Sequence, residues 1–212
     1  MGTSTVHPSP RKHPWNFQAS AYENPSVPPD RVLDEILRCA GSENWDAEMA
    51  GGAMAACLQV LVGAAAGRRV AGSPQESAAA LVEQAERSLI QSGHNSVFAE
   101  FALEGLAACA SAGRIPRTRN QTDVARVAKS FVGHAWATAV RYAFLRDAAR
   151  HVGGTRFSSG TEVRRLADEL ADRTRRRVEA AKLSQGARSG LAKGIVSRAL
   201  TEIAVHVVGE RE

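Results

Sequence analysis

Aromatic residues and cysteines are scarce in this chain of 212 residues, and proline is rare beyond position 29. Aromatic residues make up 5% of the sequence, whereas sheet proteins are usually richer in aromatic and branched side chains. The abundant alanine favours closely packed helices instead. The three cysteines, Cys39, Cys57 and Cys109, lie far apart with no CxxC pair, so neither a zinc ribbon nor a disulfide framework is indicated. We expect buried, reduced thiols in a cytoplasmic protein.

The sequence motifs of common enzymes are also missing. No GxxxxGK[ST] and no GxGxxG after a strand occur, which argues against the usual nucleotide-binding loops. The patterns HExxH, ExxH and GxSxG are absent as well, so the common helical metal sites and the hydrolase nucleophile have no counterpart. Glu100 and Glu104 share a helix face, but without a matching histidine they indicate a solvated edge. We therefore expect no metal and no cofactor, and a non-enzymatic role is favoured.

One apolar stretch, from Met49 to Ala66, could be compared with a membrane span. Its only polar side chain is Gln59, but glycine and alanine are frequent in it. These residues contribute little transfer free energy, and the stretch barely reaches the roughly 20 residues that a span requires. We expect a buried helix that packs through small residues, with no membrane partner. The N-terminus also lacks the charged and then apolar pattern of a secretory signal.

Six of the eight prolines lie within the first 29 residues. Because proline fixes its own backbone angle and removes a donor, residues 1–29 are predicted to form an extended, proline-rich arm or a disordered leader. Trp15, Phe17 and Tyr22 are interleaved with basic residues there, so the arm could dock on a partner. Residues 30–212 are predicted to form an α-helical domain, with a sub-boundary left open near 113–121.

Apolar residues recur at intervals of three or four, and no stretch alternates with period two. The pattern predicts an all-α bundle in which the helix at 122–151, apolar on two sides, runs through the middle. Capping boxes at Ser73–Glu76 and Ser159–Glu162 predict two helix starts. The seven expected helices span about 30–40, 45–67, 74–91, 96–112, 122–151, 160–183 and 189–208.

The positive charge of the chain comes almost entirely from arginine. Of 27 basic residues 23 are arginine, the net charge is +5 and the pI is about 9.6. A guanidinium can bind phosphate through two hydrogen bonds, although frequent arginine and alanine are also typical of a GC-rich bacterial genome. Two clusters are candidates for nucleic-acid binding: Arg114, Arg117, Arg119, Arg126 and Lys129 in the first, and Arg173, Arg175, Arg176, Arg177, Lys182 and Arg188 in the second.

A different activity is suggested by the sequence Arg146-Asp147-Ala148-Ala149-Arg150-His151 near the end of the long helix. The spacing of arginine and histidine resembles the Rx4–6H signature of HEPN-type ribonucleases, small all-α proteins in which two such motifs meet across a dimer. The resemblance implies that His151 acts as a general base on a ribose hydroxyl, that Arg146 steadies the phosphate, and that Asp147 orients them. The alternative is a contact between Asp147 and His151 at a helix C-terminus, where the helix dipole favours histidine.

Three functions follow from these patterns. The leading hypothesis is a non-catalytic binding or assembly protein, and a subunit of a larger complex, whose arginine clusters contact nucleic acid, RNA or DNA, independently of sequence. The second is a helical ribonuclease that uses Arg146, Asp147 and His151. The third is a protein–protein scaffold in which the arginines pair with an acidic partner. The sequence does not determine the oligomeric state.

Overall fold

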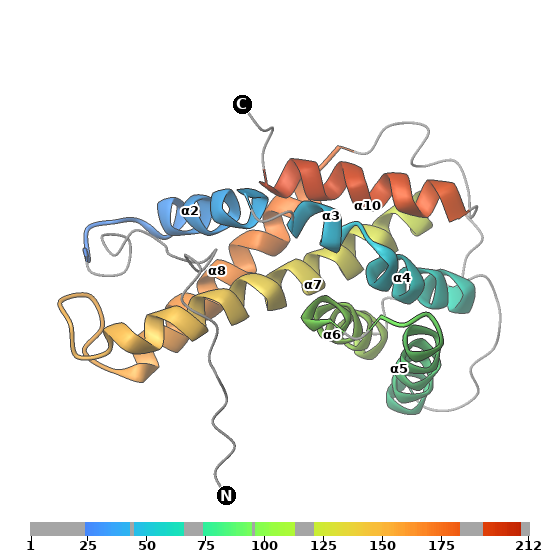
Figure 1. Ribbon diagram of the computed structural model, residues 1–212, viewed down its shortest axis with the longest axis horizontal. Coiled ribbons are helices and arrows are strands. Elements are labelled where there is room, and N and C mark those ends of the chain that lie inside the picture. Colours follow the sequence, from blue (N-terminus) through green and yellow to red (C-terminus); the bar gives the residue numbers. More distant parts are fainter. Residues whose placement is uncertain are drawn as a thin grey trace, which may run out of the picture.

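The computed structural model describes residues 24–42, 45–65, 74–94, 96–112, 121–182 and 193–208. Within these ranges the chain is an all-α bundle, as predicted, and the one β-type contact is an isolated bridge between Val152 and Phe157 (Figure 1). The helices are α2 (Pro29–Ser42), α3 (Trp45–Met49), α4 (Gly52–Ala65), α5 (Pro74–Gln91), α6 (Val97–Ser111), α7 (Gln121–Ala148), α8 (Gly160–Ala180) and α10 (Lys193–Val208), with the short 3-10 helix η1 (Ala149–His151) after α7.

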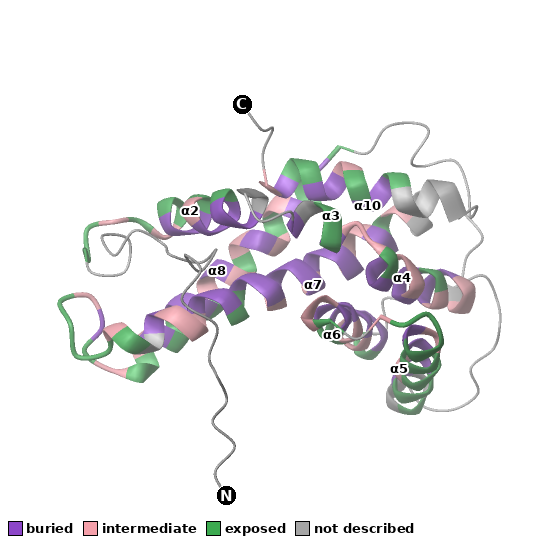
Figure 2. Ribbon diagram, viewed as in Figure 1, coloured by how far each residue is buried: buried purple, intermediate pink, exposed green. Residues whose placement is uncertain are grey.

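Helix α7 runs through the middle of the bundle, where it contacts α2, α4, α6, α8 and α10. Figure 2 shows buried residues along its length, and Phe131, Trp136 and Phe144 are fully buried, which confirms the central position predicted from its two apolar rows. Tyr142 of the same helix is 46% exposed. Its ring packs 5.6 Å from the ring of Phe101, an arrangement in which an amphipathic side chain keeps its hydroxyl near water.

Helix α8 lies alongside α7 and buries one row of apolar side chains. Val163, Leu170 and Val178 are buried in the core. Thr174, which lies in the same row, is also fully buried, and its hydroxyl donates a hydrogen bond of 2.8 Å to the carbonyl oxygen of Leu170. This bond satisfies a polar group that would otherwise be costly to bury.

The prediction of a single helix at 45–67 was wrong, because the chain divides there into α3 and α4. The break falls at Ala50 and Gly51, where the amide of Gly51 donates to the carbonyl oxygen of Glu48 at 3.0 Å. Two consecutive glycines weaken a helix, since glycine loses more backbone freedom than other residues on folding. The next residue, Gly52, packs against the ring of His94. A Cβ added to Gly52 would lie 2.3 Å from two atoms of that ring.

By length and composition the segment Ala47–Ala64 could cross a membrane. In the structure, however, it contains the break between α3 and α4. Its large side chains, among them Met49, Met54 and Leu58, are buried in the common core. The large side chains of this segment therefore belong to the interior of the bundle, whereas several of its small residues, such as Ala55 and Gly63, are only partly buried.

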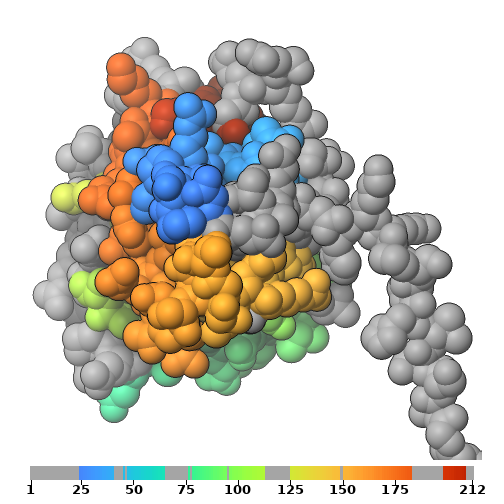
Figure 3. All heavy atoms as spheres, turned by 90° about the vertical axis from the view of Figure 1, so that its left-hand side faces the viewer, coloured from blue at the N-terminus to red at the C-terminus, as the bar shows by residue number. Residues whose placement is uncertain are grey.

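Helix α2 packs on α8 near the connection between α7 and α8 (Figure 3). Residues 24–28, which the sequence assigned to the N-terminal arm, are held by Arg156 of that connection. Its guanidinium donates hydrogen bonds to the carbonyl oxygens of Asn24 and Val27 at 2.9 and 2.8 Å. The attached part of the chain thus begins before position 30, and residues 1–23 lie outside the described ranges.

Candidate functional site

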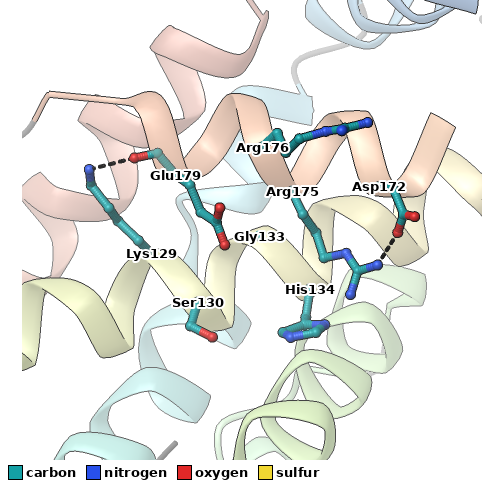
Figure 4. Close-up of a pocket in the computed structure, with 8 residues that line it drawn as sticks. All are labelled: Lys129, Ser130, Gly133, His134, Asp172, Arg175, Arg176 and Glu179. Atoms are coloured by element: carbon teal, nitrogen blue, oxygen red, sulfur yellow. Dashed lines mark hydrogen bonds and ion pairs between the residues drawn. The ribbon is translucent and has the colours of Figure 1, made fainter. Parts of the chain in front are cut away.

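A pocket of about 260 Å³ lies between α7 and α8 (Figure 4). Each helix contributes four residues at spacings that place them on one side of the helix. The pocket thereby combines three cations, two carboxylates, a hydroxyl and an imidazole. Its lining consists of Lys129, Ser130, Gly133 and His134 from α7, and of Asp172, Arg175, Arg176 and Glu179 from α8.

Gly133 lines the α7 side of the pocket and lies close to α8. An added Cβ would lie 3.7 Å from the Cβ of Val178 and 3.8 Å from the Cα of Arg175, which are ordinary contact distances. Packing therefore does not require glycine at this position. Next to it, the hydroxyl of Ser130 accepts a hydrogen bond of 3.4 Å from the thiol of Cys109 on α6.

The cations of the pocket differ in how they are held. The ammonium of Lys129 donates to the carbonyl oxygen of Glu179 at 2.9 Å, close to the C-terminus of α8, where the helix dipole favours a positive charge. Arg175 is paired with Asp172 and points toward His134 (Figure 4). Arg176 is exposed, extends along α8, and makes no ion pair within the described ranges. The pocket is therefore cationic, but part of its charge is balanced by its own carboxylates.

The pocket brings together residues from both predicted arginine clusters. Lys129 belongs to the first cluster, and Arg175 and Arg176 belong to the second. Arg126 lies one turn before Lys129 on α7 and is exposed, and Lys182 is exposed just beyond the end of α8. The other members of the clusters, Arg114, Arg117, Arg119 and Arg188, lie outside the described residues.

Two arginines of the second cluster face α2 rather than α7. Arg173 bonds Asp30 at 2.5 Å and Glu169 at 2.7 Å, and Arg177 bonds Asp34 at 2.6 Å. The run from 173 to 177 is therefore divided between two sides of α8, because successive residues of a helix point in different directions. On the α2 side, each guanidinium already has a carboxylate partner.

Sequence reasoning did not associate Ser130 or His134 with the basic clusters. It also named neither Asp172 nor Glu179 as a site residue. The signal that could have grouped them is their helical spacing, since 172, 175, 176 and 179 lie on one side of α8. That spacing cannot show that the α7 side faces the same pocket, because the register between two helices is set by their packing.

The motif that resembles HEPN-type ribonucleases lies at the other end of α7. The guanidinium of Arg146 donates to both carboxylate oxygens of Asp147, at 3.1 and 3.3 Å. His151 is the last residue of η1 and is partly exposed. The arginine of the motif is thus oriented by its own neighbour, and the motif is separate from the α7–α8 pocket.

The cysteines and acidic residues form no second chemical centre in the described part of the chain. The three cysteines are buried, as expected, and form no disulfide, and burial raises the pKa of Cys57 to about 12. A thiol with that pKa is protonated near neutral pH and is a poor nucleophile. No group of three or more histidine, cysteine or acidic residues is placed to hold a metal ion among the described residues, and Glu100 and Glu104 are exposed on α6.

Comparisons of the chain with protein-family models, with curated proteins and with solved structures found no match.

Proposed function

We propose that this protein is a non-catalytic helical binding protein that contacts the phosphate backbone of nucleic acid through the surface formed by α7 and α8. The observation that carries the proposal is the pocket in which Lys129, Arg175 and Arg176 meet from two helices. These residues come from separate basic clusters of the sequence, and their convergence offers several cations to one polyanion. Phosphate contacts of this kind position a nucleic acid without reading its sequence.

The charge of the two helices supports this proposal. Residues 121–182, which include α7 and α8, carry 13 basic and 7 acidic side chains, a net charge of +6. The exposed Arg126 and Lys182 extend the basic surface beyond the pocket along α7 and at the end of α8. A surface of this charge attracts phosphates, and the affinity falls as the salt concentration rises, because the release of counterions from the nucleic acid then gains less free energy. A role as a subunit of a larger nucleic-acid complex is consistent with the same surface.

The proposal is tested by fluorescence anisotropy with labelled RNA and DNA over a series of salt concentrations. The double variant Arg175→Ala, Arg176→Ala should bind at least about tenfold more weakly than the wild type, and its log–log salt slope should be shallower by about 2. The matched control is Arg164→Ala, Arg165→Ala, which removes two adjacent exposed arginines from the same helix. This control should change the affinity less than about threefold.

Three outcomes contradict the proposal in different ways. Equal losses in the two double variants would show that binding depends on overall charge and not on the α7–α8 surface. If the protein binds neither RNA nor DNA at low salt, the protein–protein scaffold would be the remaining hypothesis. Cleavage of the RNA, seen on a gel of the same samples and abolished by His151→Ala, would show a ribonuclease instead.

A further inference from the structure

The α7–α8 pocket contains two carboxylates that a surface for phosphates alone does not need. Asp172 and Glu179 lie among the three cations of the lining, and a carboxylate repels phosphate oxygens at short range. Asp172 is also paired with Arg175, but its side chain is 56% exposed. In Figure 4 the carboxylate of Glu179 extends toward the α7 wall. The pocket thus presents hydrogen-bond acceptors to a ligand as well as cationic donors.

The bases of a nucleic acid carry hydrogen-bond donors that could pair with these two carboxylates. The exocyclic amino groups of cytosine, adenine and guanine donate hydrogen bonds, and aspartate or glutamate accepts them from cytosine. In a duplex these groups are paired or reached only through a groove, whereas the bases of a single strand can be unstacked and bound one at a time. The mixture of carboxylates and cations therefore matches a single strand better than a duplex.

The volume of the pocket and the planar side chains of Arg175 and His134 also favour a single strand over a duplex. At about 260 Å³ the pocket is smaller than the roughly 300–1,000 Å³ cavities that enclose drug-sized ligands. It can admit one base, but it cannot admit a double helix. Arg175 extends toward the imidazole of His134 (Figure 4), and both guanidinium and imidazole planes are used to stack bases in single-strand recognition.

We propose that the pocket binds one unstacked, amino-bearing base of a single-stranded nucleic acid. Asp172 and Glu179 accept hydrogen bonds from the base edge, and Lys129 and Arg176 contact the adjacent phosphates. The inference rests on the function proposed above, because it concerns the same surface. It adds that the preferred substrate class is single-stranded and that the two carboxylates contribute to the preference.

The test compares three probes by fluorescence anisotropy at about 100 mM salt: a single-stranded oligo(dC), an abasic oligonucleotide of the same length, and a duplex of the same length. The wild type should bind oligo(dC) at least about tenfold more tightly than either of the other probes. The double variant Asp172→Ala, Glu179→Ala, which removes both acceptors, should lose most of that preference. Its affinity for the abasic strand and for the duplex should stay equal or rise, since two charges that repel phosphate are gone.

The matched control is Asp168→Ala, which removes an exposed carboxylate of α8 that pairs with Arg141 outside the pocket. This variant should keep the preference for oligo(dC). Equal wild-type binding of all three probes, or an unchanged preference in the double variant, would overturn the inference and leave the phosphate-binding function standing. Binding of none of the probes would overturn both.

Discussion

Single residues decide how closely α6 and α7 approach. Gly105 of α6 faces α7, where an added Cβ would lie 3.0 Å from the carbonyl oxygen of Phe131 and 3.0 Å from both the amide nitrogen and the Cβ of Ala135. Backbone atoms cannot move aside as a flexible side chain can, so the glycine is required by the packing. Gly63 of α4 differs, since an added Cβ there meets no atom within 4 Å. The abundance of small residues is visible in the sequence, but the position of the helix crossing is not.

The substitution Gly105→Ala should therefore destabilise the protein, while Gly63→Ala should not. The added methyl at 105 forces α6 and α7 apart, and overpacking of this kind costs about 1–3 kcal/mol. At 63 the better helix propensity of alanine should stabilise the fold by up to about 1 kcal/mol. Urea unfolding of both variants measures the two free energies. Equal stability of Gly105→Ala and the wild type would show that the two helices are not in close contact at this position.

At the scale of the helix, the N-terminus of α8 shows how far the predicted capping box at Ser159–Glu162 is formed. The hydroxyl of Ser159 accepts a hydrogen bond from the amide of Glu162 at 3.4 Å, as the capping box predicts. The carboxylate of Glu162, however, bonds Ser158 and not Ser159: it accepts from the amide at 2.7 Å and from the hydroxyl at 3.0 Å. The reciprocal bond has moved by one residue, but the helix N-terminus is still capped.

These bonds make the stability contribution of Glu162 depend on pH. The backbone and side-chain hydrogen bonds from Ser158 lower the pKa of Glu162 below its ordinary value of 4.5. Its stabilisation is therefore present above pH 4.5 and is lost as the pH falls through the lowered pKa. Glu162→Gln should melt a few degrees below the wild type at pH 7, and the difference should be smaller at pH 2.

Thermal melts at the two pH values measure this effect. The control Glu104→Gln changes an exposed carboxylate in the middle of α6 and should leave the melting temperature nearly unchanged at both pH values. A difference for Glu162→Gln that is as large at pH 2 as at pH 7 would contradict the assigned hydrogen bonds.

Apolar contacts hold α2 in place more strongly than its ion pairs do. Val32, Ile36 and Leu37 are each about 1% exposed, and burying one such side chain contributes about 1.5–3 kcal/mol. The pair between Asp34 and Arg177 is partly exposed, and pairs of this kind contribute at most about 1 kcal/mol. The ion pair of Arg177 is therefore not the main interaction that holds α2 on the bundle.

At the scale of the whole molecule, charge is separated between helix pairs. Residues 74–112, which include α5 and α6, carry five acidic side chains and one basic side chain, a net charge of −4, whereas residues 121–182 carry +6. In Figure 1, α5 lies at the opposite side of the bundle from α2 and most of α8. A polyanion should therefore meet attraction at α7 and α8 and repulsion at α5.

Chemical modification of arginine tests where a nucleic acid lies on the molecule. Bound oligo(dC) should slow the reaction of phenylglyoxal with Arg176 by several-fold, because a phosphate covers its guanidinium. Arg87 of α5, whose side chain is 65% exposed, should react at the same rate with and without the oligonucleotide. Peptide mass spectrometry measures both rates in one sample. Equal protection of the two arginines would place the nucleic acid elsewhere or show that binding is diffuse.

The sequence by itself determined the helical class, the central position of α7 and the capped start of α8. These features depend on the spacing of neighbouring residues, and the buried rows of α7 and α8 confirm that spacing. The break between α3 and α4 was missed because Gly51 and Gly52 were counted as small residues of a packed helix. Only the tertiary structure decided that Lys129 and Arg175 share one pocket while Arg173 faces α2, because the register between packed helices depends on side chains that are distant in the sequence.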